Sequence, residues 1–270
     1  MVNKKDATTY QGIQLNVSEA AVLQDLEEII GEPIPPSGIA FYRTGFVHAN
    51  QHVTGLSLHN KQLTIIPEGI HALTQLERLY LRDNQLTTLP STIGMLTHLQ
   101  NLDVFNNKIT KLPETIGELS QLRRFDLSRN FTPSLPKNIG NLQSLERLGL
   151  LNIQLESLPD TIGNLTNLWD FIASINHLMS IPDSIGKLTK LKRLVLHENS
   201  LTTIPDTLGQ LVNLELLSLH SNQLTTLPST VTQLKSLTVL RLEHNQFKPI
   251  STAVIKWISD LKSKGCRVRI

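Results

Sequence analysis

The chain has 270 residues, 25 of them basic and 23 acidic, and a formal net charge of +2. So balanced a charge argues against nucleic-acid binding by counterion release and against a polybasic membrane anchor. Aromatic residues make up only 4% of the chain while Leu recurs throughout it. This composition favours a core of many similar aliphatic layers over one globular core of mixed large side chains.

Residues 1–16 are predicted to be a disordered N-terminal segment. They contain Lys4 and Lys5 but no apolar stretch that could serve in a secretory signal, and no run in the chain approaches transmembrane length. Cys266 is the single cysteine, so an internal disulfide is impossible. These features predict a cytoplasmic protein that does not bind a membrane.

Residues 17–52 are predicted to form an N-terminal cap made of a helix and a hairpin strand. Ser18 can cap the helix, Gly31 follows its end, and the apolar positions between them fall on one stripe. The stripe comprises Val22, Leu23, Leu26, Ile29 and Ile30. Two extended segments, 39–47 and 53–58, then indicate a hairpin that covers the first strand of the following array.

Residues 53–250 repeat with a strict period of 23 residues. The period is marked by seven Asn residues that lie 23 residues, or a multiple of 23, apart: Asn84, Asn107, Asn130, Asn176, Asn199, Asn222 and Asn245. The slots at Ile153 and Lys61 lack the Asn but keep the register through the surrounding leucines, giving nine turns, the last partial. An Asn here can bond the backbone of neighbouring turns from inside the molecule, so these residues are predicted to be structural.

The first half of each turn is predicted to form a strand. Leu79 and Leu81 are two residues apart, so in an extended segment both point inward while Arg78 and Tyr80 point outward. Successive turns stack such segments in parallel, about 4.8 Å apart. The result is a parallel concave sheet of about nine strands.

The second half of each turn is predicted to form a convex side. Pro90 and its equivalents end the inner segment, because proline fixes φ and cannot prolong a sheet ladder. Gly94 and its equivalents indicate either a tight turn or close packing of neighbouring coils. The predicted fold class is an α/β repeat: a right-handed curved solenoid with a short helical or 3-10 convex side and a helical cap at each end.

One full turn, residues 76–96, reads Leu-Glu-Arg-Leu-Tyr-Leu-Arg-Asp-Asn-Gln-Leu-Thr-Thr-Leu-Pro-Ser-Thr-Ile-Gly-Met-Leu. It resembles the leucine-rich repeat, and most closely the intracellular Ras-group type, which carries a Leu-Pro-x-x-Ile-Gly-x-Leu segment. The resemblance covers about residues 53–250. It implies a leucine-rich-repeat solenoid that binds protein, with small GTPases, phosphatases or kinases as partners by family analogy.

Residues 251–270 are predicted to form a C-terminal cap, completing a capped module. Ser251 can cap a helix whose apolar positions face the last turn, and Gly265 stops it. Those positions are Val254, Ile258 and Leu261, flanked by Ile255 and Trp257, which are expected to join them. Residues 266–270 alternate like a short strand.

The outward positions of the inner strands have no packing role, so they are predicted to bind the partner. Sixteen residues form this candidate surface: Arg78, Tyr80, Arg82, Phe105, Arg124, Arg129, Arg147, Leu151, Trp169, Ile172, Ile175, Arg193, Val195, His197, Leu216 and His220. Seven of the eleven arginines take outward positions and none of the fourteen lysines does, which favours recognition because interfaces are enriched in Arg and depleted in Lys. Alternatively, the arginines simply pair across strands with Asp103, Asp126 and Asp170.

An apolar group lies among the outward positions of the middle and later turns. Its members are Leu151, Ile172, Ile175, Val195 and Leu216, with Trp169 at the flank. A partner that buries them under a rim of arginines would explain such exposed aliphatic side chains. The alternative is that they are β-forming residues that only stabilise the sheet.

Two further features are candidates for chemical sites. His197 and His220 are neighbours with carboxylates close by, but side chains on adjacent parallel strands converge poorly, so no metal is expected. Cys266, beside Lys264 and Arg267, could have a lowered pKa, but packing in the cap is the favoured role. No cofactor is expected.

The sequence lacks a phosphate loop, a nucleophile elbow and an HExxH motif. It therefore predicts a monomeric, non-catalytic interaction module, regulatory or scaffold protein that binds another protein on its concave face. An exported effector or adhesin that binds a host or surface protein is the alternative, and an enzyme is a weaker one.

Overall fold

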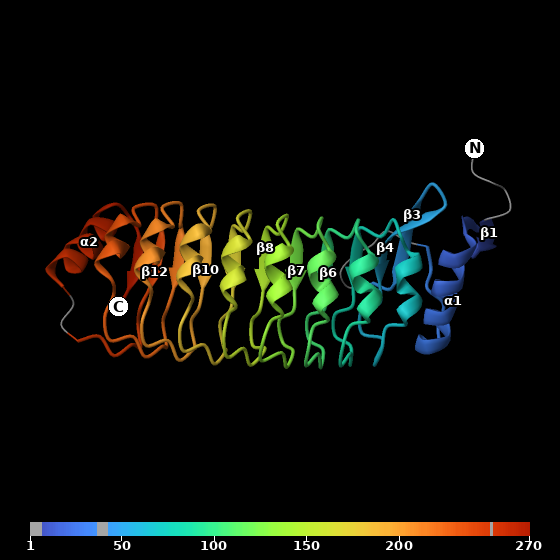
Figure 1. Cartoon of the computed structure of the whole chain (residues 1–270), viewed down its shortest axis with the longest axis horizontal. Helices are drawn as coiled ribbons and strands as arrows, with labels where there is room; N and C mark the ends of the chain where they lie inside the picture. The colour runs from blue at the N-terminus through green and yellow to red at the C-terminus, as the bar shows by residue number, and fades with distance from the viewer. Residues whose placement is uncertain (1–6, 37–42, 249–250) are drawn as a thin grey trace.

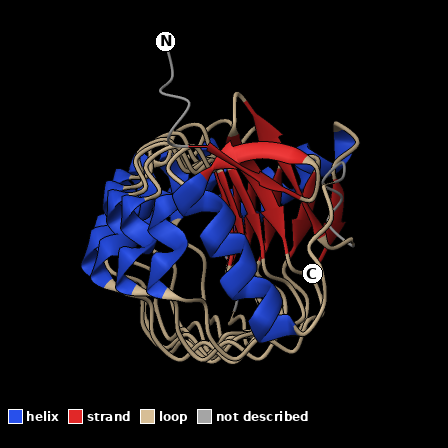
Figure 2. Cartoon of the chain, turned by 90° about the vertical axis from the view of Figure 1, so that its right-hand side faces the viewer, coloured by secondary structure: helices blue, strands red, loops and turns tan. Residues whose placement is uncertain are grey.

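The computed structural model describes residues 7–36, 43–248 and 251–270, and in it the turns stack side by side along one long axis (Figure 1). Within these residues, an 11-stranded sheet runs the length of the array in the order β13-β12-β11-β10-β9-β8-β7-β6-β5-β4-β3. Seen along the axis, the sheet lines one side of the turns and the helices line the other (Figure 2). The predicted leucine-rich-repeat solenoid is thus confirmed.

The repeat contributes nine parallel strands to this sheet. They are β4 (His52–Ser57), β5 (Arg78–Tyr80), β6 (Asn101–Asp103), β7 (Arg124–Asp126), β8 (Arg147–Gly149), β9 (Asp170–Ile172), β10 (Arg193–Val195), β11 (Leu216–Ser218) and β12 (Val239–Arg241). Each pairs with the next in a register of 23 residues, as Arg124 does with Arg147. The caps add the other two strands, antiparallel β3 (Gly45–Ala49) and parallel β13 (Arg267–Arg269).

Each turn buries the same set of aliphatic positions. Leu79 and Leu81 are fully buried, as their spacing predicts, and Leu86, Ile93 and Leu96 complete the layer. Burying an aliphatic side chain of this size contributes about 1.5 to 3 kcal/mol, so each turn gains stability only by stacking on its neighbours.

The Asn residues of the repeat form a ladder inside the solenoid. At Asn176, Oδ1 accepts the backbone N–H groups of Ile153 and Leu155, both at 3.0 Å, and Nδ2 donates to the carbonyl oxygens of Leu150 and Ser174. Each Asn therefore satisfies backbone groups of its own turn and of the turn before it, and without it these buried groups would lack partners.

The ladder has a gap where Ile153 replaces Asn, and a second substitution lies next to it. Thr132 occupies a position where the repeat has Leu. In other turns the backbone N–H of this Leu donates to the repeat Asn of the next turn, as Leu86 does to Asn107, but here that Asn is replaced by Ile153. Thr132 is buried, and its hydroxyl donates to the carbonyl oxygen of Ile109 at 2.9 Å. The polar side chain thus finds its own partner, and the neighbouring strands β7 and β8 keep the common register.

Over the described residues, the convex side consists of eight five-residue 3-10 helices, one per turn. They are η1 (Glu68–Ala72), η2 (Ser91–Met95), η3 (Glu114–Glu118), η4 (Lys137–Asn141), η5 (Asp160–Asn164), η6 (Asp183–Lys187), η7 (Asp206–Gln210) and η8 (Ser229–Gln233). Each begins directly after the repeat proline, whose fixed φ suits this position, as at Pro90 with φ −63°. Hydroxyls link successive turns here, as Thr115 does to the carbonyl oxygen of Ser91 at 2.7 Å.

The repeat glycine allows neighbouring 3-10 helices to pack closely. A Cβ at Gly163 would lie 2.4 Å from the carbonyl oxygen of Ser184 in the next turn, and the other glycines of this slot meet the same obstacle. Of the two explanations that the sequence left open, close packing of coils is correct. The last turn has Thr232 in this slot, and none of the described residues after that turn forms another 3-10 helix to pack against it.

The N-terminal segment is ordered where disorder was predicted, at least over residues 7–16. Strands β1 (Ala7–Tyr10) and β2 (Ile13–Asn16) pair in an antiparallel hairpin, with Gln11 and Gly12 at positive φ in the turn. Tyr10 and Leu15 are buried in the common core. The sequence prediction missed this hairpin because two four-residue strands and a Gln-Gly turn give a weaker signal than Asn-Gly or Asp-Gly would.

Helix α1 (Val17–Ile30) covers the first turn of the array. Asn16, rather than the predicted Ser18, caps it, because its side chain accepts the N–H of Ser18 at 3.0 Å. Gly31 ends the helix in the left-handed conformation, as predicted, whereas Ile29 is exposed instead of buried.

A buried carboxylate, which sequence analysis did not single out, joins α1 to the first hairpin of the sheet. Glu19 is buried and accepts the N–H of Val53 and a bond from Nδ1 of His52, both at 2.6 Å. Burial raises the pKa of Glu19, and these hydrogen bonds oppose the rise. The hairpin itself, β3 and β4, is the one predicted, although residues 39–42 of its expected first strand lie outside the described residues.

Helix α2 (Thr252–Ser263) closes the other end. Ser251 caps it, and Val254, Trp257 and Ile258 are buried, whereas Ile255 is exposed, contrary to the prediction. The strand predicted after this helix is β13, which pairs with β12 at the end of the sheet. Among the described residues, no helix combines the length and the apolar character needed to cross a membrane.

Candidate functional site

The concave face comprises the outward side chains of β4–β12 and those of the second and third residues after each strand. The common register sets these side chains in columns, so that Arg124, Arg147 and Asp170 are neighbours, as are Asp103 and Asp126. The sheet therefore brings the predicted outward residues onto one surface.

The last column of this face lies in the turn beyond each strand. From Asn60 to His244, its residues have φ between 53° and 59°, the left-handed region. Arg129 and Ile175, both predicted to bind the partner, belong to this column and so lie at the rim of the sheet. A β-branched residue is rare at positive φ, yet Ile175 is held there and is 40% exposed.

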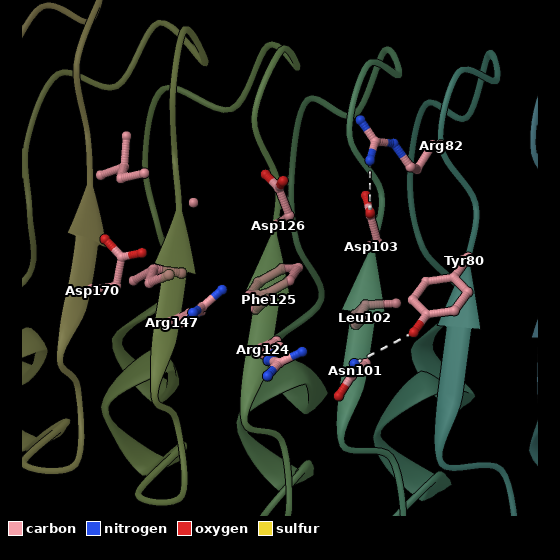
Figure 3. A pocket seen from close by; sticks show the side chains of 13 residues that line it. Tyr80, Arg82, Asn101, Leu102, Asp103, Arg124, Phe125, Asp126, Arg147 and Asp170 are labelled. Carbon is pink, nitrogen blue, oxygen red and sulfur yellow. Dashed lines mark hydrogen bonds and ion pairs between the residues drawn. The ribbon is translucent and has the colours of Figure 1, made fainter. Parts of the chain in front are cut away.

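A depression of about 280 Å³ lies over strands β5 to β9 (Figure 3). Its lining residues are Tyr80, Arg82, Asn101, Leu102, Asp103, Arg124, Phe125, Asp126, Arg147, Leu148, Gly149, Asp170 and Ile172. The absence of a side chain at Gly149 makes room for the carboxylate of Asp126, whose Oδ1 lies 2.7 Å from where a Cβ of Gly149 would be. Five of the residues predicted to bind the partner line this depression, namely Tyr80, Arg82, Arg124, Arg147 and Ile172.

Arg124 and Arg147 share one column of the depression with Asp170, and Asp103 and Asp126 share the next column. Figure 3 shows Asp103 and Asp126 further along their strands than Arg124 and Arg147. Burial, with the nearby charge of Asp126 adding to it, raises the pKa of Asp103 to about 6, while the N–H of Phe105 opposes the rise. A cationic group placed near Asp103 would therefore stabilise a carboxylate that the protein itself leaves poorly compensated.

Ion pairing within the chain explains only part of this charge pattern. Arg82 Nη1 lies 3.6 Å from Asp103, and Arg193 Nε lies 3.6 Å from Asp170, as the cross-strand alternative requires. Arg147 instead places its guanidinium 4.2 Å from the centre of the Trp169 ring. Arg147 is nevertheless in register with Asp170, and its charge, like that of Arg193, opposes the rise that burial causes in the pKa of Asp170.

Phe105 lies between two arginines near the N-terminal end of the array. The guanidinium carbons of Arg82 and Arg129 are 4.5 and 5.3 Å from the centre of its ring. Cation–π contacts of this kind hold long side chains in fixed positions on the surface. Three of the predicted partner-binding residues are thus organised around one ring.

The predicted apolar group is dispersed rather than continuous. Ile172 and Val195 are paired in register and half-buried, but Leu216 lies in the other column opposite Arg193. Ile175 is at the rim. Of this group, Ile172 is the member that lines the depression.

The two histidines lie beyond the depression, over β10 and β11. The rings of His197 and His220 are stacked, with centroids 4.3 Å apart and an interplanar angle of 9°. Burial lowers the pKa of both, and each lies near Arg241, which lowers it further. Across the described part of the chain, no group of three His, Cys, Asp or Glu is arranged to hold a metal.

Two residues need a revised interpretation. Gly149 was not predicted to belong to the site, although a glycine inside a strand often marks a close approach by a ligand. Cys266 is buried, and burial raises its pKa, so the lowered pKa considered from the sequence is wrong. Its position agrees with packing in the cap.

Comparison with known proteins identifies the family. The leucine-rich-repeat region model matches residues 51–180 and 114–200, and a second leucine-rich-repeat model matches 189–247. The chain therefore belongs to the leucine-rich-repeat family, whose domains commonly mediate protein–protein interaction. No curated protein matches it.

Several solved structures share the fold. A leucine-rich-repeat protein of Leptospira interrogans is 27% identical, with a TM-score of 0.53, over 80% of this chain and 71% of that one. The Arabidopsis thaliana receptor kinase ectodomain GASSHO1/SCHENGEN3, in complex with CASPARIAN STRIP INTEGRITY FACTOR 2, is 30% identical over 76% of this chain, with a TM-score of 0.61. The plant peptide hormone receptor RGFR1, in complex with RGF2, is 31% identical over 72%, with a TM-score of 0.54. The chain spans only 29% and 40% of these two receptors.

Proposed function

We propose that this chain is a non-catalytic interaction module that binds a protein partner on its concave face. The observation that carries the proposal is the depression over β5 to β9, which holds arginines and carboxylates fixed on a rigid sheet. Fixed side chains lose little conformational entropy on binding, which favours recognition. Similar structures that were solved with a ligand of this kind include the plant peptide hormone receptor RGFR1 with RGF2.

We further propose that the repeats are of the intracellular Ras-group type and that the protein is a cytoplasmic monomer acting as a regulatory or scaffold subunit. The Leu-Pro-x-x-Ile-Gly-x-Leu segment supports the type. The short edge strand β13 carries Arg267 and Arg269, and charges on an edge strand oppose edge-to-edge association. Cell fractionation together with light scattering on the purified protein tests both points. A secreted or dimeric protein would contradict them and favour an exported effector or adhesin.

Substitutions on the two faces test the binding surface. Arg147→Ala, Ile172→Ala and Arg193→Ala should each weaken binding of the partner by about 2 kcal/mol where these residues act as hot spots. Their stability should change by less than about 0.5 kcal/mol, because surface substitutions usually cost little. Affinity is measured by calorimetry with the partner recovered by crosslinking from the native cell.

The matched controls, Lys187→Ala and Glu118→Ala, lie on exposed positions of the convex 3-10 helices and should bind like the wild type. Equal affinity of all folded variants would place the binding surface elsewhere, with the N-terminal cap and its hairpin as the next candidate.

A further inference from the structure

The depression contains two rows of like charge. The basic row is Arg124 and Arg147, which are in register on β7 and β8, and the acidic row is Asp103 and Asp126, in register on β6 and β7. Like charges directly opposite one another on neighbouring strands are destabilising. Asp170 follows Arg147 in the same column, but the pairs Arg124–Arg147 and Asp103–Asp126 still set like charges opposite one another, and these two pairs need another explanation.

The rest of the chain compensates only part of the two rows, because Asp103 lies 3.6 Å from Nη1 of Arg82. Within the described residues, neither Arg124 nor Arg147 nor Asp126 takes part in an ion pair. Oδ1 of Asp126 accepts the N–H of Ser128, two residues further along its own turn, at 3.0 Å. A partner could therefore engage these charges without breaking an existing ion pair.

Beside the acidic row, β8 has Gly149 where the other strands carry side chains, and the carboxylate of Asp126 lies over this glycine. A Cβ at this position would meet Oδ1 of Asp126 at 2.7 Å and the hydroxyl of Ser128 at 3.1 Å. On the next strand, Asp170 is only 8% exposed, and its buried Oδ1 accepts no hydrogen bond from the described residues. This oxygen lies 3.6 Å from Arg193 Nε, which is too long for a hydrogen bond. Asp170 is in register with Arg147, whereas Gly149 has Ile172 as its neighbour, so the carboxylates of Asp126 and Asp170 lie in different columns of the depression.

The spacing of the rows defines what fits them. Arg124 and Asp126 are two residues apart on one strand, and a strand advances about 3.4 Å per residue, so the rows are about 7 Å apart. Two side chains at positions i and i+2 of an extended segment share one face and have the same separation.

Building on the proposed function, we propose that the partner presents an extended segment with an oppositely charged pair two residues apart. Its Lys or Arg side chain lies on the carboxylate of Asp126 over Gly149, and its Asp or Glu side chain lies on Arg124 and Arg147. The segment thus sets an opposite charge against each row.

Immobilised peptide arrays test this chemistry directly and do not require the native partner. The probes are otherwise randomised peptides that contain Glu-x-Lys or Lys-x-Glu, since the segment can run in either direction. Control arrays carry Glu-x-Glu, Lys-x-Lys, or the same two charges at adjacent positions. The purified full chain should select the first two classes, and the best of them should lose about tenfold in affinity on Gly149→Ala, Asp126→Asn or Arg124→Gln.

Lys187→Ala is the control variant and should retain full affinity, and thermal melting verifies that every variant is folded. Selection of peptides without regard to charge or spacing, no selection at all, or wild-type affinity in folded Gly149→Ala would overturn the proposal. If charge proves irrelevant while Ile172→Ala and Arg193→Ala still weaken peptide binding, concave-face binding stands and only the charged pair is wrong. If no concave substitution affects binding of any peptide, both proposals fail.

Discussion

The interior of the solenoid and its concave face respond differently to the same 23-residue period. Inside, contacts recur from turn to turn: Oδ1 of Asn107 accepts the N–H of Leu86 at 3.0 Å, and Oδ1 of Asn199 accepts that of Leu178 at the same distance. On the concave face, one column changes from Asp126 to a bare glycine and then to Ile172 over three strands. Stacking requires every interior to match its neighbour, whereas the sheet backbone accepts any outward side chain. Specificity can therefore vary without a change of fold.

The largest expected effect comes from breaking the interior ladder. Asn176→Ala should lower the free energy of unfolding by about 3 kcal/mol, because it leaves the buried N–H groups of Ile153 and Leu155 without partners. Asn245→Ala should lower the free energy of unfolding by less, because Asn245 lies half-buried at the end of the ladder. Urea unfolding followed by circular dichroism gives both values. Equal, negligible losses would show that the ladder does not stabilise the array.

Two glycines sharpen the comparison further, one on each side of the solenoid. Gly163→Ala should lower the stability of the fold by about 2 kcal/mol, because the new Cβ would meet the backbone carbonyl of Ser184. That carbonyl cannot move without shifting a whole turn. Gly149→Ala should cost much less, since its nearest obstacle is the end of the Asp126 side chain. Thermal melting compares them directly. A larger loss at Gly149 would mean that the concave face also constrains stacking.

The smallest effect concerns the charge on the concave face. The raised pKa of Asp103, about 6 against an ordinary 3.8, means that the folded state holds this proton more tightly than the unfolded chain does. The associated stability is fully present below pH 3.8 and is lost as the pH rises through about 6. Asp103→Asn should therefore stabilise the protein at pH 8 by about 1 kcal/mol, since loss of the ion pair with Arg82 offsets part of the gain.

Below pH 3.8 the gain from Asp103→Asn should vanish, because the wild-type carboxyl group is then neutral as well. Melting curves across the pH range follow this difference. An Asp103→Asn variant that is less stable than the wild type at pH 8 would indicate that the carboxylate is fully compensated within the chain.

Prediction from the sequence succeeded where one residue has one role in every turn. Leu79, Asn176 and Pro90 recur at fixed spacing, and their burial, hydrogen bonding and fixed φ follow from chemistry that acts within a turn or between neighbours. It failed at the ends, where nothing repeats. The β1–β2 hairpin has a weak turn signal, and the choice of Asn16 over Ser18 as cap depends on where that hairpin stops.

The candidate site was predictable as a surface but not as a set of contacts. Period 2 in a strand places Arg147, Asp126 and Ile172 outward whatever surrounds them. Which guanidinium turns to a carboxylate and which to an aromatic ring depends on side-chain rotamers. Arg193 approaches Asp170, whereas Arg147 stacks on Trp169, and the sequence pattern does not distinguish the two.

The sequence by itself determined the solenoid, its register and the identity of its outward face, because a strict period leaves one way to bury every leucine. Only the tertiary structure decided that the Asp126 carboxylate lies over Gly149, that Arg147 stacks on Trp169 and that Arg193 approaches Asp170, since these features arise between side chains of neighbouring turns. The physical reason is that burial is set by each residue's own apolar character, whereas electrostatic environment and free space belong to the neighbours that stacking brings together.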